Sequence, residues 1–572
     1  MVKELAEAFR LHQDGRLDAA EVAYAKVLSA HPDDPVALIN AGALALARDD
    51  LDGAVTRLSR AVTLVPRNAV AQNNLGFALV RAGRLAEALG ALDRAVALQA
   101  NYALAHNNRG IAFVRLGRRD DAAAAFERAL ALAPDLTDAA VNLGDIHAER
   151  GDAHAAAEIY ERALQFQPAN PAARAGRAFA AALSGDLEDA RRQLETLVAD
   201  VPQHAPSWQT LGAVLNWSWE HASAEAAFTR ALALSPDSRD AQFGIASSLL
   251  GRGCYREGFA AFEHRTEGLL DRETRLPQYP SWSGGRMAGT LLIYAEQGFG
   301  DVVQCVRFVA ATRERVDRVV VLADGYWKPL APLLATAAGV DRVVTDVDSL
   351  AGETVGARVS MLSLPYVLSI EAGVLPGVVP YLRAPGHEAD RWQANLASMR
   401  PPRVGLAWSV QARDAHGFVT RHKSIPADAV ATLLTVPDVR FTSLQPGVAG
   451  DPNAFGVLAP HVAGWGAELG DFGATAALID ALDLVITADT AVAHVAGALG
   501  RDVWLIDRFN GCWRWRVADE TSPWYPTMKI FRQDRFGDWS GVLQRVRARL
   551  DEWRRLRPDT ASRPRAPRVE TG

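Results

Sequence analysis

The sequence predicts a two-part fold: an all-α superhelix of repeated helix pairs, followed by an α/β region with two lobes. Three observations lead to this prediction. Alanine and proline recur every 34 residues in the first half of the chain. In the second half, short apolar segments alternate with helical stretches, and this pattern restarts after Pro401 and Pro402. Eleven of the fourteen tryptophans follow residue 270, which indicates that the two halves are different kinds of protein.

The seven 34-residue units share a small residue and a large apolar residue, and all but one, which has Ala100 instead, end with a proline. The small residue lets two helices approach, the large one fills the groove, and the proline ends the second helix. The alanines are Ala20, Ala54, Ala88, Ala122, Ala156, Ala190 and Ala224. Glycines mark one register of the first helix at Gly42, Gly76, Gly110, Gly144 and Gly212. The prolines are Pro32, Pro66, Pro134, Pro168, Pro202 and Pro236, and the residue eight positions before each is Tyr, Phe or Leu. A degenerate eighth unit with Gly258 and Phe262 indicates a cap, so the array is predicted over residues 1–272.

This periodicity resembles the tetratricopeptide repeat, whose first helices line a concave surface. Asparagine recurs there every 34 residues, and each amide supplies both a donor and an acceptor. The row is Asn40, Asn74, Asn108 and Asn142. It resembles the asparagine ladder of O-GlcNAc transferases, which implies that the row binds the backbone of an extended peptide. The alternative is that asparagine before Leu-Gly is simply common in this repeat type.

Composition limits the functional class and the compartment. The 572 residues are 49% hydrophobic and 22% charged. The net charge of -6 argues against general binding to nucleic acid, so no nucleic-acid partner is expected. Cys254, Cys305 and Cys512 match no zinc or redox spacing, which suits a reducing compartment. The first residues lack the apolar region of a signal peptide, and no apolar run reaches about 18 residues. We therefore expect a cytoplasmic protein without a transmembrane segment.

The second half is predicted to form two lobes built on parallel sheets. Residues 273–288 are rich in Pro, Gly and Ser and are predicted to form a linker. Strands are expected at 291–296, 319–324, 340–345 and 358–362, and then at 403–409, 439–445, 482–488 and 502–507. The lobes are placed at 289–400 and 401–556, the second with a closing helix. The basic, proline-rich tail at 557–572 is predicted to be disordered.

The first motif with chemical potential is AEQGFGD at residues 295–301, where a predicted strand meets a predicted helix. Gly298 and Gly300 permit a tight turn with close backbone approach. Asp301 stands at the helix start, so it is either a structural cap or a general base at the carboxyl end of a strand.

The second motif is ITADTAVAHVAGALG at residues 486–500. We expect the strand to end at Ala488 and Asp489 to cap the following helix. Exposed amides at a helix start suit a diphosphate, and the small residues Thr490 and Ala491 let that group come close. Asp489 is also a candidate for binding a sugar hydroxyl, while His494 either binds phosphate or holds the turn.

Further candidates lie on two loops and one helix start of the second lobe. In TRHKSI at residues 420–425, Arg421 and Lys423 would neutralise a leaving diphosphate and Ser424 would donate to it; the alternative is a solvated basic loop. Candidates on the nucleotide side are Gln445, Asp471 and Thr475.

Together these segments resemble bacterial proteins that fuse tetratricopeptide repeats to a heptosyltransferase-like glycosyltransferase of the GT-B fold, a group that includes flagellin glycosyltransferases. The resemblance implies a nucleotide-sugar donor as substrate, a protein acceptor such as flagellin, and neither metal nor cofactor. It also implies that Asp301 is the base. Val410, Thr420 and Cys512 depart from the family pattern, where glycine, aspartate and aspartate are usual. Two alternatives therefore stay open: a glycolipid transferase, and a repeat scaffold with a degenerate transferase half.

Overall fold

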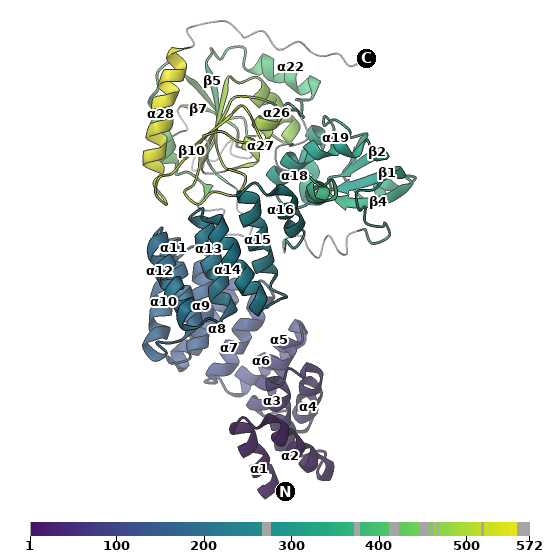
Figure 1. Cartoon of the computed structure of the whole chain (residues 1–572), viewed down its shortest axis with the longest axis vertical. Helices are drawn as coiled ribbons and strands as arrows, with labels where there is room; N and C mark the ends of the chain where they lie inside the picture. Colours follow the sequence, from purple (N-terminus) through teal and green to yellow (C-terminus); the bar gives the residue numbers. More distant parts are fainter. Residues whose placement is uncertain are drawn as a thin grey trace. The chain divides into compact units, whose positions relative to one another are not determined.

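The computed structural model describes residues 2–265, 276–370, 378–410, 423–445, 458, 461–466, 468–515 and 520–556. The chain divides into two compact units, Met1–Ser184 and Gly185–Gly572. Each unit is considered by itself below, and Figure 1 labels the elements of both.

The first unit is a run of helices that pack as successive antiparallel hairpins. The helices are α1 (Val2–Gln13), α2 (Leu17–Ala30), α3 (Pro35–Ala47), α4 (Leu51–Leu64), α5 (Ala69–Arg81), α6 (Leu85–Leu98), α7 (Ala103–Arg115), α8 (Arg119–Leu132), α9 (Thr137–Glu149), α10 (Ala153–Phe166) and α11 (Pro171–Leu183). Pro66, Pro134 and Pro168 each follow the end of a helix by two residues, as the periodicity predicts.

Close approach of paired helices explains the conserved spacing of small and large residues within the repeats. A Cβ atom at Gly76 would lie 2.5 Å from Leu92 Cγ, and one at Gly110 would lie 2.5 Å from Phe126 Cε1. Leu92 and Phe126 are fully buried. Glycine is therefore required on the first helix because the large side chain of the second helix occupies the space that a Cβ would need.

The turn between the two helices of each repeat has its own 34-residue register. One residue per turn adopts a positive φ, and these residues recur every 34 positions. They are Gly15, Asp49, Gly83, Gly117, Gly151, Gly185, Trp219 and Gly253, with φ between 62° and 94°. Glycine adopts this conformation without steric cost, whereas Asp49 and Trp219 adopt it despite their side chains.

The second unit begins with α12 (Leu187–Asp200), α13 (Ala205–Trp217), α14 (His221–Leu234), α15 (Arg239–Gly251) and α16 (Tyr255–Phe262). A four-stranded parallel sheet follows, in the order β3-β2-β1-β4. Its strands are β1 (Met287–Tyr294), β2 (Val316–Leu322), β3 (Arg342–Val344) and β4 (Val355–Ser360). The intervening helices are short: α18 (Phe299–Cys305), α19 (Val309–Thr312), α20 (Ala331–Leu334) and α21 (Leu364–Val367).

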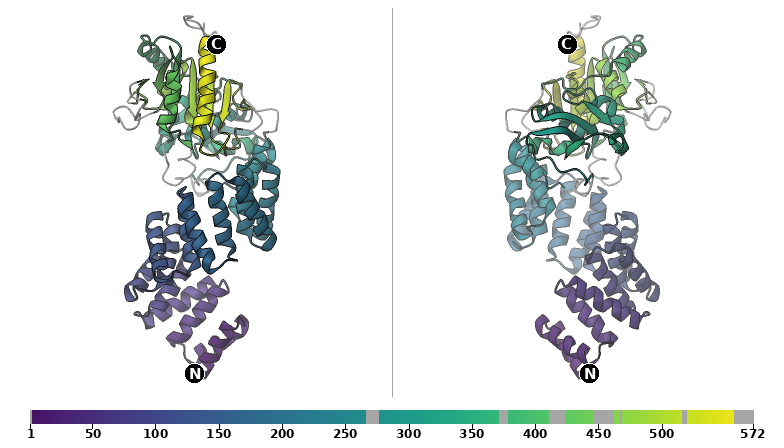
Figure 2. Two further views of the ribbon diagram at one scale, coloured as in Figure 1. Left: turned by 90° about the vertical axis from the view of Figure 1, so that its left-hand side faces the viewer. Right: turned by 90° about the vertical axis from the view of Figure 1, so that its right-hand side faces the viewer.

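A six-stranded parallel sheet, in the order β10-β9-β8-β5-β6-β7, forms the second lobe. Its strands are β5 (Arg403–Ala407), β6 (Arg440–Ser443), β7 (Val462–Ala463), β8 (Leu484–Ala488), β9 (Val503–Asp507) and β10 (Met528–Arg532). The helices are α22 (Gly386–Asn395), α24 (Ala427–Val430), α26 (Phe472–Asp480), α27 (Ala491–Ala498) and α28 (Trp539–Arg555). The long helix α28 crosses one face of this sheet (Figure 2), where Val542, Val546 and Leu550 join its core. The predicted fold class, helical repeats followed by two Rossmann-like lobes, is confirmed.

One continuous core joins the last repeat to both lobes. Tyr255, Phe259 and Phe262 of α16 share a buried cluster with strand residues of both sheets. Trp513 contacts two of these rings, with centroids 6.0 Å from Phe259 and 6.5 Å from Phe262.

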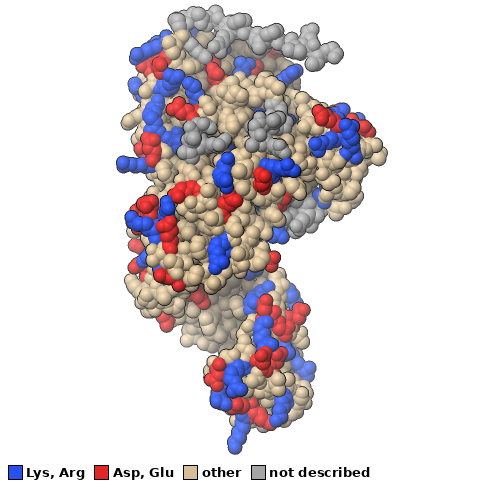
Figure 3. Space-filling view, in the orientation of Figure 1, with Lys and Arg blue, Asp and Glu red and all other residues tan. Residues whose placement is uncertain are grey.

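Acidic and basic side chains alternate on the repeat helices visible in Figure 3. Several arginines bridge neighbouring repeats, including Arg48 to Asp18 and Arg119 to Glu149. Exposed pairs of this kind contribute about 0–1 kcal/mol each, so they favour solubility and register more than stability. In the part of the chain that the structure describes, no helix combines the length and apolar composition needed to cross a bilayer.

Candidate functional site between two strand ends

The glycine loop of the first lobe and the helix start of the second lobe lie against each other. Helix α18 follows β1, helix α27 follows β8, and the two helices are in contact. A Cβ atom at Gly300 would lie 2.7 Å from His494 Cδ2 and 3.6 Å from the Cα of Ala491. Glycine at position 300 therefore allows the two motifs to meet, although 184 residues lie between them in the sequence.

Asp301 has a different partner on each carboxylate oxygen. Its Oδ2 accepts a hydrogen bond of 3.1 Å from the Gly298 amide, which caps α18 as one of the two hypotheses predicts. Its Oδ1 accepts from the Arg514 guanidinium, which also donates to Gln304 Oε1 at 2.6 Å. Although burial opposes it, the Asp301 carboxylate raises the pKa of Arg514 above its ordinary value.

Asp489 is a buried, ion-paired carboxylate that follows β8. It is 7% exposed, its Oδ1 accepts from Trp515 Nε1 at 3.0 Å, and its Oδ2 lies 2.7 Å from Lys423 Nζ. Burial alone would raise its pKa, but the Lys423 ammonium holds the pKa of Asp489 well below its usual range. Asp489 is therefore ionised at neutral pH and is paired with one of the cations predicted to bind phosphate.

The prediction that Asp489 caps the following helix is wrong. The N-cap of α27 is Thr490, whose Oγ1 accepts a 3.2 Å hydrogen bond from Val492. The physical reason is that Lys423 and Trp515 already engage the Asp489 carboxylate, so the next residue satisfies the helix start.

His494 is a buried neutral side chain rather than a cation. Its Nδ1 lies 2.9 Å from the Tyr525 hydroxyl, and its ring centroid lies 5.2 Å from that of Trp515. Burial, together with the positive charge of Arg514, lowers the pKa of His494 to about 4. Of the two roles considered for this residue, the geometry favours holding the turn over binding phosphate by charge.

The remaining candidates of the second lobe have local structural partners. Gln445 Oε1 accepts from the amides of Trp408 and Ser409 at 2.8 and 2.6 Å, and thus joins the ends of β5 and β6. Asp471 caps α26, and the hydroxyl of Thr475 donates to its carbonyl at 3.0 Å. The hydroxyl of Ser424 accepts from Val410 at 3.0 Å. Arg421 and Thr420 lie outside the described residues.

In the first unit, three residues of the predicted asparagine row form hydrogen bonds with the neighbouring asparagines Asn73 and Asn107. Asn108 donates to Asn73 of the preceding repeat at 2.8 Å, and Asn73 donates to Asn74 at 3.1 Å. Asn142 donates to Asn107 at 3.4 Å. Asn108 and Asn142 each use one amide donor in these bonds and Asn74 uses its acceptor, so fewer groups of the row remain for a ligand than the spacing alone implies. Asn40, by contrast, lines an apolar groove of about 390 Å³ beside Val2 and Phe9.

Two groups of contacts near the predicted motifs have no counterpart among the predicted residues. Arg514 and Trp515, in the sequence CWRW, supply the partners of Asp301 and Asp489. The sequence signal for this segment is W-R-W at 513–515, directly after Cys512, which departs from the family pattern. The second group surrounds Glu296, which precedes the glycine loop.

Glu296 forms a buried ion pair with Arg265, which lies three residues after the end of α16. Arg265 Nε and Nη2 donate to the two Glu296 oxygens at 2.9 and 2.8 Å, and both side chains are 1% exposed. Arg265 also donates to Glu263 at 2.7 Å and to Ser363 at 3.0 Å. This bidentate network fixes the base of the glycine loop to the end of the repeats.

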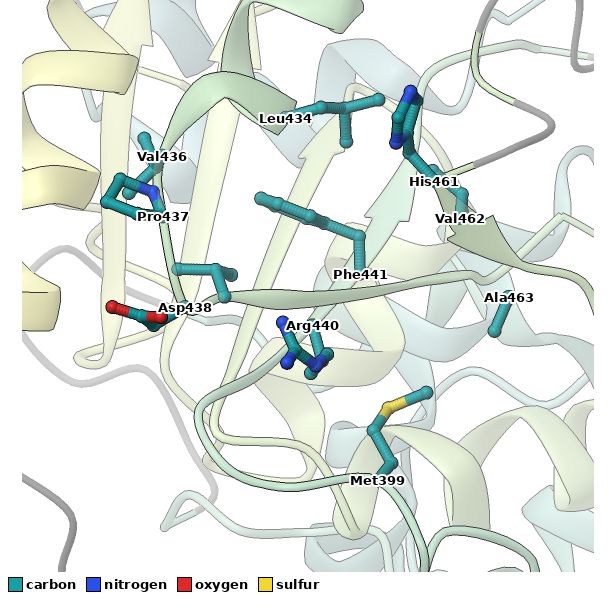
Figure 4. A pocket seen from close by; sticks show the side chains of 11 residues that line it. Met399, Leu434, Val436, Pro437, Asp438, Arg440, Phe441, His461, Val462 and Ala463 are labelled. Carbon is teal, nitrogen blue, oxygen red and sulfur yellow. The ribbon is translucent and has the colours of Figure 1, made fainter.

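One cavity among the described residues lies away from these motifs. It measures about 540 Å³ and is lined by Met399, Phe441, His461 and neighbouring residues (Figure 4). It surrounds the amino end of β6, whereas ligand sites of parallel sheets form at the carboxyl ends of the strands. We therefore place the candidate site at Asp301 and Asp489 and not in this cavity.

Comparisons with known proteins bear on the repeats and on about half of the chain. Tetratricopeptide-repeat families match residues 11–63 and 147–215, residues 67–135, and residues 107–173. Protein FlbA of Caulobacter vibrioides is 29% identical over 343 residues, which cover 54% of this chain and 55% of FlbA. The chain thus spans about half the length of the curated relative that it matches.

Solved structures similar to the chain include MamA, with 27% identity, 28% of this chain and 94% of that chain covered, and a TM-score of 0.26. A tetratricopeptide repeat protein from Parabacteroides merdae has 16% identity, 43% and 98% coverage, and a TM-score of 0.38. PilF of Pseudomonas aeruginosa has 20% identity, 35% and 91% coverage, and a TM-score of 0.32. The family matches show that the N-terminal part of the chain contains tetratricopeptide repeats, and the sequence match shows a homologue in FlbA.

Proposed function

We propose that the chain is a cytoplasmic glycosyltransferase that moves a sugar from a nucleotide-activated donor to a Ser or Thr hydroxyl of a protein held by the repeats. The observation that supports this proposal most strongly is the contact between the two motifs. Asp301, at the start of α18, and Asp489, after β8, are joined through the neighbouring residues Arg514 and Trp515. Both aspartates follow the carboxyl ends of parallel strands, where α/β enzymes bind substrates.

The reaction requires one proton acceptor and stabilisation of one leaving group. The acceptor oxygen forms a bond to the anomeric carbon, the bond from that carbon to the diphosphate oxygen breaks, and the electron pair leaves with the nucleoside diphosphate. Asp301 accepts the hydroxyl proton, a role that contributes about 10²–10⁴-fold to the rate of such reactions. Metal and cofactor are not invoked.

Two cations are available beside these carboxylates. Lys423 pairs with Asp489 and Arg514 pairs with Asp301. An incoming diphosphate would compete for both cations and would draw them toward the charge that develops on the leaving group. Release of Arg514 by the diphosphate would also free Asp301 Oδ1 to accept a proton.

The repeats are proposed to hold the acceptor as an extended segment, with flagellin or another exported protein as the substrate. Their family membership supports protein binding. The test is the affinity of the acceptor for a four-site Asn→Ala variant at 40, 74, 108 and 142. A loss of about tenfold or more is expected if each lost amide bond costs about 0.5–1.5 kcal/mol. Unchanged affinity would contradict a role for the row.

A second candidate is a repeat scaffold whose transferase half is degenerate. The observation that favours it is that both acidic groups of the site are already neutralised by ion pairs. Incubation of purified protein with nucleotide sugars and candidate acceptors separates the two functions. The transferase adds a sugar mass to the acceptor and releases nucleotide, whereas the scaffold binds acceptor and does neither.

A further inference from the structure

Trp219 lies at a turn position where six of the eight repeats have glycine. Its φ is 64°, in the left-handed region that side chains rarely adopt. The residue lies between α13 and α14, and its indole is directed at the second lobe: Nε1 donates to the Phe509 carbonyl at 3.1 Å. The residue with the strained conformation therefore also makes a specific contact with the loop after β9.

The indole also lies under a guanidinium. Arg532, the last residue of β10, has its Cζ 4.8 Å from the centroid of the Trp219 ring. The Arg532 side chain is 15% exposed, so this cation–π contact is largely shielded from water. Trp219 thus holds two elements at the carboxyl edge of the six-stranded sheet, the loop at Phe509 and the end of β10.

Arg532 connects Trp219 to the candidate site. Its Nη2 donates to the Trp515 carbonyl at 2.5 Å and its Nε donates to Asp507 Oδ2 at 3.1 Å. The indole of Trp515 in turn donates to Asp489. Trp515 is fully buried, so it has little freedom to adjust if Arg532 moves.

We propose that Trp219 is a positioning residue for the diphosphate site: through Arg532 and Trp515, the repeat region holds Asp489 and the start of α27 in their binding geometry. This inference rests on the proposed function for its ligand, a nucleoside diphosphate. It goes beyond that function because it makes a repeat residue part of the donor site, independent of acceptor binding.

The test exploits the register of the repeats. Trp219→Gly introduces the residue found at this position in six repeats. The turn is therefore expected to keep its conformation and to lose the backbone strain. Asp49→Gly is the matched control, because Asp49 is the other side chain at this position, with φ 62°. Trp219→Phe keeps a ring under Arg532 but removes the indole donor, and it tests the same contact without changing backbone freedom.

Binding of inorganic pyrophosphate, ADP, GDP, CDP and UDP is measured by calorimetry on the full chain. For the probes that bind wild-type protein, we expect Trp219→Gly to raise the dissociation constant about tenfold or more, Trp219→Phe to raise it less, and Asp49→Gly to leave it unchanged. Affinity for the protein acceptor is expected to stay the same in all three. Unchanged probe affinity in Trp219→Gly would overturn the inference.

Hydrogen exchange in the protein without ligand decides the inference even if no probe binds. We expect the amides of residues 489–493 and 512–515 to exchange faster in Trp219→Gly than in wild type or Asp49→Gly. Unchanged exchange there would overturn the positioning role. Absence of probe binding to wild type, combined with faster exchange, would contradict the proposed donor site and leave the positioning role supported.

Discussion

Arg514, on the second lobe, donates a charge-assisted hydrogen bond to Asp301, which stands 213 positions earlier on the first lobe. The same guanidinium reaches Gln304 at 2.6 Å. Because its planar fork holds two acceptors of α18 at once, Arg514 fixes the lobe that carries the proposed base against the lobe that carries the diphosphate site.

Arg514→Lys is expected to lower the rate of sugar transfer by about 10–100-fold, because an ammonium keeps the charge but cannot hold both acceptors in the fork geometry. The measurement is the initial rate of sugar incorporation into the acceptor. Arg549→Lys is the control, since Arg549 pairs with Glu552 on the exposed face of α28. Equal rates for wild type and Arg514→Lys would contradict a role for this contact.

Gly300→Ala is expected to push α18 away from α27, because the new Cβ would lie 2.7 Å from His494 Cδ2. Overpacking of this kind costs about 1–3 kcal/mol in the free energy of unfolding. Denaturant unfolding measures the cost. Gly386→Ala is the matched control at a helix start with open space around it, and it should cost less. Equal stability of the two variants would argue against close packing of the motifs.

His494 makes stability depend on pH in a definite direction. Burial lowers its pKa to about 4, so between about pH 4 and about pH 6.5 the unfolded chain binds a proton that the folded chain does not. Stability from this group is therefore present at neutral pH and is lost as pH falls, by about 2 kcal/mol between about pH 7.5 and about pH 5. Asp507, whose pKa burial raises to about 6, acts in the opposite sense over part of this range.

The measurement that isolates His494 is the difference in unfolding free energy between wild type and His494→Gln at the two pH values. We expect the variant to lose less stability on acidification than wild type. Tyr525→Phe removes the hydroxyl partner and keeps the titrating ring, so it should retain most of the wild-type slope. Identical slopes for wild type and His494→Gln would show that His494 does not titrate as its burial requires.

Within the repeats, Gly110→Ala is expected to destabilise the first unit, since the added Cβ would lie 2.5 Å from the ring of Phe126. The expected cost is about 1–3 kcal/mol. Gly90→Ala is the control on the neighbouring helix α6, where the nearest atom is the end of the Arg94 side chain at 3.9 Å. There alanine should stabilise the helix by up to about 1 kcal/mol. Thermal unfolding of the two variants should therefore shift in opposite directions.

Features that repeat, or that are local in sequence, were predictable. The 34-residue spacing determines which residues of paired helices meet, and Gly110 against Phe126 follows from that register. Asp301 and Asp489 each come after a parallel strand in the sequence. This position predicts that each lies at the carboxyl edge of its own sheet. Strand β10 lies outside the strands expected from the sequence, the last of which is 502–507.

Partners that are distant in sequence were not predictable. Arg265 and Glu296 lie 31 positions apart across a predicted linker, and nothing in either segment specifies the other. Trp219 and Arg532 are still further apart, and only the unusual side chain at a left-handed turn position marks the first of them. The cap predicted at Asp489 is wrong for the same reason, since its partner Lys423 lies 66 positions earlier in the sequence.

The most direct test of the central claim is the intact mass of flagellin and other surface proteins from cells that produce either the wild-type chain or Asp301→Asn. The account predicts a protein that is heavier by a sugar with the wild-type chain and unmodified with Asp301→Asn, while the variant still binds that acceptor. Asp538→Asn, which alters a helix cap on α28, should behave as wild type. Equal masses with wild type and Asp301→Asn would contradict protein glycosylation by this chain, and altered lipopolysaccharide in their place would indicate a glycolipid acceptor.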